Sequence, residues 1–174
     1  MESLRKLAIN NFHQAIEISP GQVVEIATLI IQFPRWKGEG LSETSKGSYK
    51  IKPLVDVDGE PLFGELAILR WLQKDSWNGI WVDTYHGHFW NGLPDRTSPV
   101  QLPHHADVIY DKIVEANGKA GGFFDVFAWR DKEFLFAEYK GKGDTIKPNQ
   151  SAWISSVLKS GIPLNSLLLV EFEK

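Results

Sequence analysis

Residues 122–140 read GFFDVFAWRDKEFLFAEYK, two apolar runs separated by a short charged segment. Runs rich in aromatic and β-branched residues on either side of Arg130-Asp131-Lys132 predict an antiparallel hairpin. A loop of two residues, Asp131-Lys132, or of four, residues 130–133, would place Asp125 directly opposite Glu138. A three-residue loop would shift this register. Asp-Lys is not a favoured pair for a two-residue type I′ turn, so we expect the four-residue loop.

Three charged residues, Asp125, Glu138 and Lys140, stand in these otherwise apolar runs. Side chains alternate along a strand, so Glu138 and Lys140 share a face, and the predicted register brings Asp125 within about 5 Å of Glu138. Two carboxylates at that distance repel each other unless a cation lies between them. Oxygen ligands favour Mg²⁺ or Mn²⁺, and Lys140 would then orient or deprotonate a water molecule.

The alternative is that Glu-x-Lys marks only the solvated face of a strand. The neighbouring residues argue against this interpretation, because Phe134 and Phe136 would share the face of Glu138. Leu135 and Ala137 make the opposite face apolar as well. A sheet that is buried on both faces but charged at one end is typical of a functional site.

Together with the residues that follow, this stretch resembles the VRR-NUC branch of the PD-(D/E)XK nuclease superfamily. That branch occurs in phage and bacterial nucleases and in the Fanconi-associated repair nuclease. The resemblance covers roughly residues 120–171. The pattern of the branch is an Asp, then Glu-x-Lys, a Gly/Asp loop, a Gln and an aromatic residue that open a helix, and finally a Gly. In this sequence the corresponding residues, in the same order, are Asp125, Glu138-Tyr139-Lys140, Gly141-Lys142-Gly143-Asp144, Gln150, Trp153 and Gly161. Phe124 stands where the superfamily name implies Pro. The resemblance implies a restriction-endonuclease-like α/β fold, with a mixed central sheet flanked by helices.

The resemblance also implies roles for the residues of the motif. Asp125 and Glu138 would be ligands of Mg²⁺ or Mn²⁺, together with the backbone carbonyl of Tyr139. Lys140 would activate water, and Gln150 would support the site from the next helix.

The family places a further acid on an earlier helix, as an additional metal ligand. The best match is Glu65, which stands among apolar residues of a predicted helix. The alternative is an ordinary first-turn Glu that the helix dipole favours. Glu25 is the second candidate for the same position.

Basic residues close in sequence to the charged strands are candidates for contacts to nucleic-acid phosphates: Arg130, Lys132, Lys142 and Lys147. We expect Asp144 to be a turn or cap residue and Trp153 to be a core residue, not a platform for a base. The pairs His86-Gly87-His88 and His104-His105 are expected to be solvated, a histidine site for zinc or manganese being the alternative.

Alternating helices and strands predict one α/β layered domain. We expect a nuclease-like core over residues 61–174 and an extension over residues 1–60 that packs on it. Ser19-Pro20-Gly21-Gln22 has the pattern of a helix start, which predicts a helix over residues 23–31, although this segment is rich in β-branched residues. Residues 34–53 are basic and glycine-rich, and we expect them to form a surface segment. The remaining expected elements are helices over 63–74, 106–116 and 150–158 and strands over 79–85, 123–129, 133–140 and 166–172.

Composition limits the function further. The net charge is −3, so any contact with nucleic acid must come from a local basic patch. The chain has no cysteine, which excludes disulfides, zinc fingers and thiol catalysis. No signal peptide, membrane span, Walker A sequence or dinucleotide fingerprint is evident, so we expect a cytoplasmic protein without a nucleotide cofactor.

The sequence therefore predicts a Mg²⁺- or Mn²⁺-dependent deoxyribonuclease, selective for flaps or branched DNA in repair, recombination or phage replication. One alternative is a nucleic-acid- or protein-binding module that keeps the nuclease fold without cutting. Another is a toxin or immunity-type protein in which residues 1–60 bind a protein partner. Two further alternatives are that the chain forms a homodimer and that a protein partner supplies the affinity for DNA.

Overall fold

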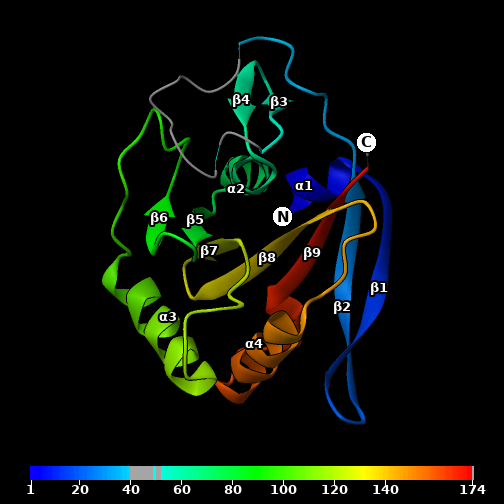
Figure 1. The fold of residues 1–174 in the computed structure, drawn as a ribbon, viewed down its shortest axis with the longest axis vertical. Coiled ribbons are helices and arrows are strands. Elements are labelled where there is room, and N and C mark those ends of the chain that lie inside the picture. Colours follow the sequence, from blue (N-terminus) through cyan, green and yellow to red (C-terminus); the bar gives the residue numbers. More distant parts are fainter. Residues whose placement is uncertain (40–48, 50–51, 174) are drawn as a thin grey trace.

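The computed structural model describes residues 1–39, 49 and 52–173. In chain order the elements are α1 (Glu2–Lys6), β1 (Ala8–Ser19), β2 (Gln22–Ile31), β3 (Val55–Val57), β4 (Glu60–Leu62), α2 (Gly64–Lys74), β5 (Asn78–Asp83), β6 (His88–Trp90), α3 (His104–Asn117), β7 (Val126–Arg130), β8 (Glu133–Gly141), α4 (Pro148–Lys159), the short 3₁₀ helix η2 (Leu164–Ser166) and β9 (Leu167–Phe172). Within the described residues, seven strands form one sheet in the order β1-β2-β9-β8-β7-β5-β6 (Figure 1). β9 runs parallel to both β2 and β8, and the other pairs are antiparallel.

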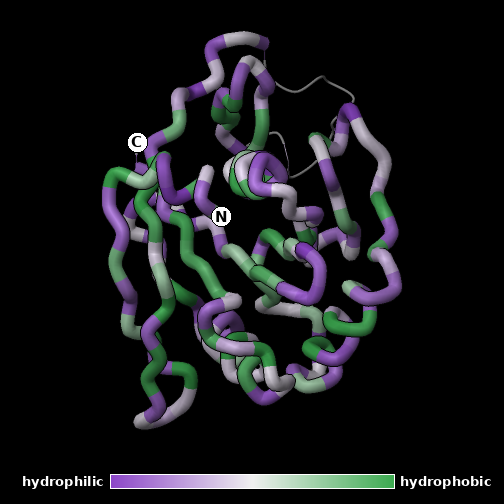
Figure 2. Tube along the Cα trace, turned by 180° about the vertical axis from the view of Figure 1, so that it is seen from behind, coloured by the Kyte–Doolittle hydropathy of each residue, from purple (hydrophilic) through white to green (hydrophobic). Residues whose placement is uncertain are grey.

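Helices cover both faces of this mixed sheet. α2 lies on one face, and α3 and α4 lie on the other (Figure 1). Leu66 of α2 packs with Val126 and Leu168, whereas Trp153 of α4 packs with Phe136 from the opposite face. Seen from behind, hydrophobic segments run through the central strands (Figure 2). The predicted sheet flanked by helices is confirmed, and it agrees with a restriction-endonuclease-like fold.

The predicted helix over residues 23–31 is wrong, because this segment is β2. Ser19 pairs with Gln22 across a tight turn, and Gly21 takes the left-handed φ of 75° that the turn needs. The β-branched residues of the segment favour an extended strand, where they pack well against their neighbours. β2 also pairs with β9, which supplies hydrogen-bond partners from the far end of the chain.

The β7–β8 hairpin has the predicted register. Val126 pairs with Ala137 and Arg130 pairs with Glu133. The loop has two residues, Asp131 and Lys132, so the expected four-residue loop is wrong. Asp131 adopts a φ of 52°, a left-handed conformation that Asp tolerates better than most residues. β7 begins at Val126, which leaves Asp125 just outside the ladder.

The other predicted elements are confirmed apart from shifts at their ends. The three predicted helices correspond to α2, α3 and α4, and Gly118 ends α3 in the left-handed conformation. Lys46 and Lys50 of the basic segment lie outside the described residues. None of the helices in the described part of the chain combines the length and apolar character that crossing a membrane requires.

Candidate active site

Two carboxylates meet where the β7–β8 ladder ends. Asp125 immediately precedes β7, and its backbone N–H donates to Glu138 Oε2 (3.2 Å). In the other direction, the backbone N–H of Tyr139 donates to Asp125 Oδ2 (3.0 Å). Each acid therefore accepts a hydrogen bond from the backbone of the opposite strand, and the predicted register brings the two acids together.

Lys140 and Gln150 join the acids in one buried network. Lys140 Nζ lies 3.1 Å from Glu138 Oε1 and donates to Gln150 Oε1 (2.9 Å). The Gln150 amide donates from Nε2 to Glu138 Oε1. The exposed fractions of Glu138, Lys140 and Gln150 are 4%, 7% and 9%. Charges buried to this degree need such partners, so the network holds Glu138 and Lys140 in place.

Gln150 lies in the first turn of α4, which places its side chain beside β8. Pro148 occupies the first turn, and the backbone N–H of Lys147 donates to Gln150 Oε1 (3.0 Å). The Gln150 side chain thus folds back on its own helix start while it reaches Lys140. Gly122 passes close by with a φ of 87°, and a Cβ added there would collide with the backbone carbonyl of Asn149.

We expect Gly122→Ala to lower the free energy of unfolding by about 2–3 kcal/mol, because the methyl group adds this collision to the cost of a left-handed conformation. Gly118→Ala is the matched control: its φ is 71°, and no atom lies within 4 Å of the added Cβ. The control should lose only about 1 kcal/mol. Denaturant unfolding of both variants measures the difference, and equal losses would contradict the close approach of α4 to residue 122.

Glu65 lies at the same site, on the first turn of α2. Its side chain is 5% exposed and forms an ion pair with Lys52. Lys52 Nζ also lies 4.6 Å from the centroid of the Trp81 ring. Glu25 occupies an exposed position of β2 and lines a separate cavity. Of the two candidate acids, the structure brings Glu65 to Asp125.

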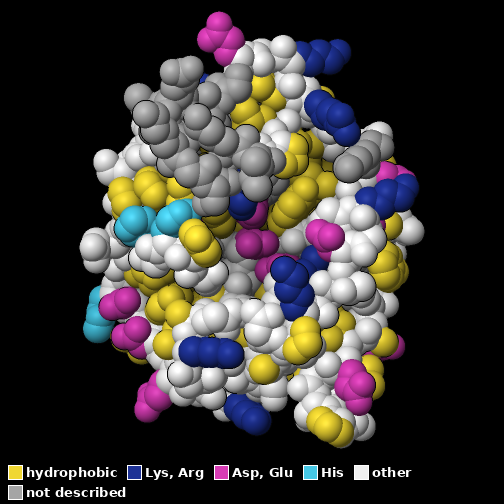
Figure 3. All heavy atoms as spheres, in the orientation of Figure 1, with side chains coloured by type: hydrophobic (Ala, Val, Ile, Leu, Met, Phe, Trp, Pro, Cys, Tyr) yellow, Lys and Arg dark blue, Asp and Glu magenta, His cyan; other side chains and the backbone are white. Residues whose placement is uncertain are grey.

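A cavity of about 410 Å³ opens over these residues, and Glu65, Asp125, Glu138 and Lys140 all line it. Acidic side chains gather in a hollow near the middle of this face, with basic side chains beside them (Figure 3). Burial, and then the neighbouring Glu138 and Glu65, raise the pKa of Asp125 well above its usual range. Burial also raises the pKa of Glu138, against the opposing effect of Lys140. Ionised acids at this position are therefore unfavourable without a cation.

The oxygen donors at this point suit a hard divalent cation. Within residues 1–39, 49 and 52–173, no group of three or more His, Cys, Asp or Glu side chains is arranged to hold a metal ion, so the alternative of a histidine metal site is not formed there. Mg²⁺ is commonly held by only one or two carboxylates, and water and substrate phosphates complete its ligands. Asp125 and Glu138 fit this requirement, because the positive charge of a cation would offset the burial that raises both pKa values and the repulsion from Glu138 that raises the pKa of Asp125 further.

Two of the predicted phosphate-contacting residues lie near the site. Lys147 lines its cavity. Lys142 lies just beyond the end of β8 and forms an exposed ion pair with Glu173 (3.4 Å). Contact of either lysine with a phosphate stays a prediction.

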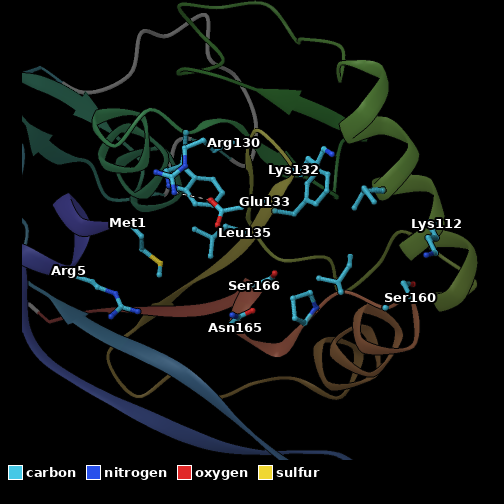
Figure 4. Close-up of a pocket in the computed structure, with 16 residues that line it drawn as sticks. Met1, Arg5, Lys112, Arg130, Lys132, Glu133, Leu135, Ser160, Asn165 and Ser166 are labelled. Carbon is cyan, nitrogen blue, oxygen red and sulfur yellow. Dashed lines mark hydrogen bonds and ion pairs between the residues drawn. The ribbon is translucent and has the colours of Figure 1, made fainter.

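Arg130 and Lys132 lie at the opposite end of the hairpin. With Arg5 and Lys112 they line a separate cavity of about 700 Å³ (Figure 4). Arg130 is held there by Glu133 (2.9 Å). Glu133, which pairs with Arg130 at this end, lies five residue steps along β8 from Glu138, about 17 Å. Any phosphate that Arg130 or Lys132 contacts would lie several nucleotides from one bound at the acids.

Two further residues have the structural roles predicted for them. Asp144 Oδ2 accepts the backbone N–H of Gly141 (2.9 Å), as a turn residue does. Trp153 is fully buried, with its ring centroid 4.6 Å from that of Phe124.

A second polar cluster, centred on Asp83, lies beside the site, and no sequence motif marks it. Asp83, buried at the end of β5, accepts hydrogen bonds from the Tyr49 hydroxyl and from His86 Nδ1 (2.8 Å). Burial opposes ionisation of Asp83, but these hydrogen bonds outweigh it and lower its pKa. The cluster and Asp125 line a common cavity of about 230 Å³. In the sequence, the feature that points to this cluster is the position of Asp83 directly after the apolar run Ile80-Trp81-Val82.

A model of the VRR-NUC domain family matches residues 67–167, more than half of the chain. The matched range includes Asp125, Glu138, Lys140 and Gln150 and begins just after Glu65. Comparison with curated proteins and with solved structures yields no match.

Proposed function

The chain belongs to the VRR-NUC domain family, a family of nucleases, and we propose that it is a Mg²⁺- or Mn²⁺-dependent deoxyribonuclease. The observation that carries the proposal is the convergence of Asp125, Glu138, Lys140 and Gln150 in one cavity. Buried acids and a buried lysine in a cleft are costly for folding and typical of catalytic sites.

In this proposal each residue of the network has a separate task. Asp125, Glu138 and the Tyr139 carbonyl would hold the cation, with Glu65 as a further acid once Lys52 releases it. The bound cation supplies positive charge that stabilises the negative charge growing on the phosphate. Lys140 Nζ orients the attacking water, and the hydrogen bonds of Gln150 hold the side chains of Lys140 and Glu138 in position. Water adds to phosphorus and gives up one proton, one P–O bond of the strand breaks, and the leaving oxygen takes up one proton, so that one new strand end carries a phosphate and the other a hydroxyl group.

A nucleic-acid substrate would be held by local contacts. The net charge is −3, so affinity would come from the lysines around the site and not from the whole surface. Lys142 and Lys147 would contact phosphates next to the cut, and Arg130 and Lys132 would contact phosphates farther along. The substrate class that we propose is flap or branched DNA in repair, recombination or phage replication, in the cytoplasm.

A cleavage assay on plasmid, linear duplex, flap and four-way-junction DNA tests the proposal. With Mg²⁺ or Mn²⁺ we expect cutting of at least one DNA, faster for the flap or junction than for linear duplex. An RNA of the same sequence as the linear duplex serves as the control for the sugar. Absence of cutting on every DNA with either metal would overturn the proposed activity.

A further inference from the structure

A groove of about 310 Å³ opens directly beside the candidate active site. Its lining comes from the end of β2, the segment before β3, and the ends of β8 and β9, and it includes Phe33, Arg35, Leu54, Tyr139, Lys142 and Phe172. We infer that this groove holds an unpaired base of the strand being cleaved, so that the enzyme selects DNA with an unpaired base next to the cut. The inference rests on the proposed function, which supplies the DNA strand.

Tyr139 joins the groove to the site. Its backbone N–H donates to Asp125 (3.0 Å), and it also lines the groove. Side chains alternate along β8, so Tyr139 points away from the face that carries Glu138 and Lys140. Tyr139 lines the cavity of the candidate active site as well as the groove, so the two cavities adjoin at this residue.

The walls of the groove are largely aromatic. The ring centroid of Phe172 lies 4.6 Å from that of Phe33 and 4.8 Å from that of Tyr139. Phe33, Leu54 and Tyr139 are only half-buried, so part of each side chain can still be covered by a ligand. Hydrophobic side chains lie beside the acidic hollow in the space-filling view (Figure 3). An apolar, aromatic groove of this volume suits a planar base, because bases stack on aromatic rings whatever their sequence.

Two cations flank these apolar walls. Arg35 forms no ion pair with any of the described residues, and the ion pair of Lys142 with Glu173 is long and exposed. Both are therefore placed to contact the phosphates on either side of a base in the groove. Aromatic rings between cations are what a single strand requires, whereas a base within a duplex is already stacked and paired.

Binding of two short DNA duplexes tests the inference. One carries a single unpaired 2-aminopurine, the other carries 2-aminopurine paired with thymine, and Ca²⁺ replaces Mg²⁺ to keep the DNA uncut. By fluorescence anisotropy we expect the native protein to bind the first duplex about tenfold more tightly. Phe33→Ala should remove this preference and leave affinity for the paired duplex unchanged. Leu54→Glu, which places a carboxylate in the groove, should do the same and serves as the second variant if Phe33→Ala does not fold.

Phe12→Ala is the matched control, since Phe12 is 40% exposed on β1 and does not line the groove. The control should keep the native preference. Equal affinity of the native protein for both duplexes, or an unchanged preference in both groove variants, would overturn the inference. Mg²⁺-dependent cutting of either duplex would leave the proposed function standing in that case. A preference that is lost in the groove variants, without cutting of any DNA, would support the groove and overturn the nuclease.

Discussion

Lys140→Ala should lose Mg²⁺-dependent DNA cleavage by about a hundredfold or more, while the protein stays folded. Lys140 Nζ is buried beside the acids: it lies 3.1 Å from Glu138 and donates a hydrogen bond to Gln150 (2.9 Å). In the proposed mechanism, alanine removes the group that would orient the attacking water and leaves the residues that would hold the cation in place. The measurement is the initial rate of cleavage with excess enzyme, compared at equal amounts of folded protein.

Removing Lys140 also leaves the buried Glu138 without its ion-pair partner, so some loss of stability is expected. Circular dichroism and a melting curve show whether the variant is folded at the assay temperature. Lys159→Ala is the control, because Lys159 lies exposed at the end of α4 and contacts none of the site residues. A folded Lys140→Ala protein that cleaves at the native rate would exclude Lys140 from catalysis.

Asp125→Asn should stabilise the metal-free protein at neutral pH by about 1–2 kcal/mol, or about 2–8 °C in melting temperature. Asparagine keeps an oxygen for the Tyr139 N–H and removes a charge that burial, Glu138 and Glu65 make unfavourable. The buried carboxylates thus destabilise the folded protein in the absence of a cation, and a bound cation would stabilise it. Melting curves in EDTA measure the effect.

The pH dependence of this effect follows from the direction of the pKa shift. The pKa of Asp125 is higher in the folded protein than in the unfolded chain, where it is about 4, so the folded state retains the proton more strongly. The native protein therefore loses stability as pH rises from about 4 through the raised pKa, and keeps the full penalty above it. The Asn variant lacks this loss, so the two melting curves should converge at acid pH. Asp144→Asn, in the exposed turn nearby, should behave as native, and identical curves for Asp125→Asn would refute the electrostatic account.

The central pairing could be predicted from sequence because it depends on local rules. A short charged segment between two apolar runs predicts a hairpin, and alternation places Glu138 and Lys140 on one face. The observed register confirms this prediction even though the loop is shorter than expected. Gln150 required the family resemblance, since nothing in the helix itself shows that its amide reaches Glu138.

Residues 19–31 show where local signals mislead. Ser, Pro and Gln at residues 19–22 have helix-start spacing, yet Gly21 closes a hairpin whose second strand pairs with β9, at the other end of the chain. Such long-range pairing overrides a local cap signal.

Lys52 and Asp83 were missed as site neighbours for a related reason. Lys52 belongs to a stretch of sequence with no motif, and only the folded structure places it next to Glu65 of α2. Asp83 gains its significance from Tyr49, which is distant in sequence. Contacts between segments that carry no shared pattern cannot be inferred from one sequence.

A bound cation would explain why Asp125 and Glu138 are buried side by side, and a calorimetric titration of Mn²⁺ into the protein tests for it. We expect the native protein to bind Mn²⁺ with measurable heat, and Asp125→Ala to show none under the same conditions. Mg²⁺ should compete with Mn²⁺ for the native protein. Equal Mn²⁺ binding by the native protein and Asp125→Ala, or no binding by the native protein, would contradict the account.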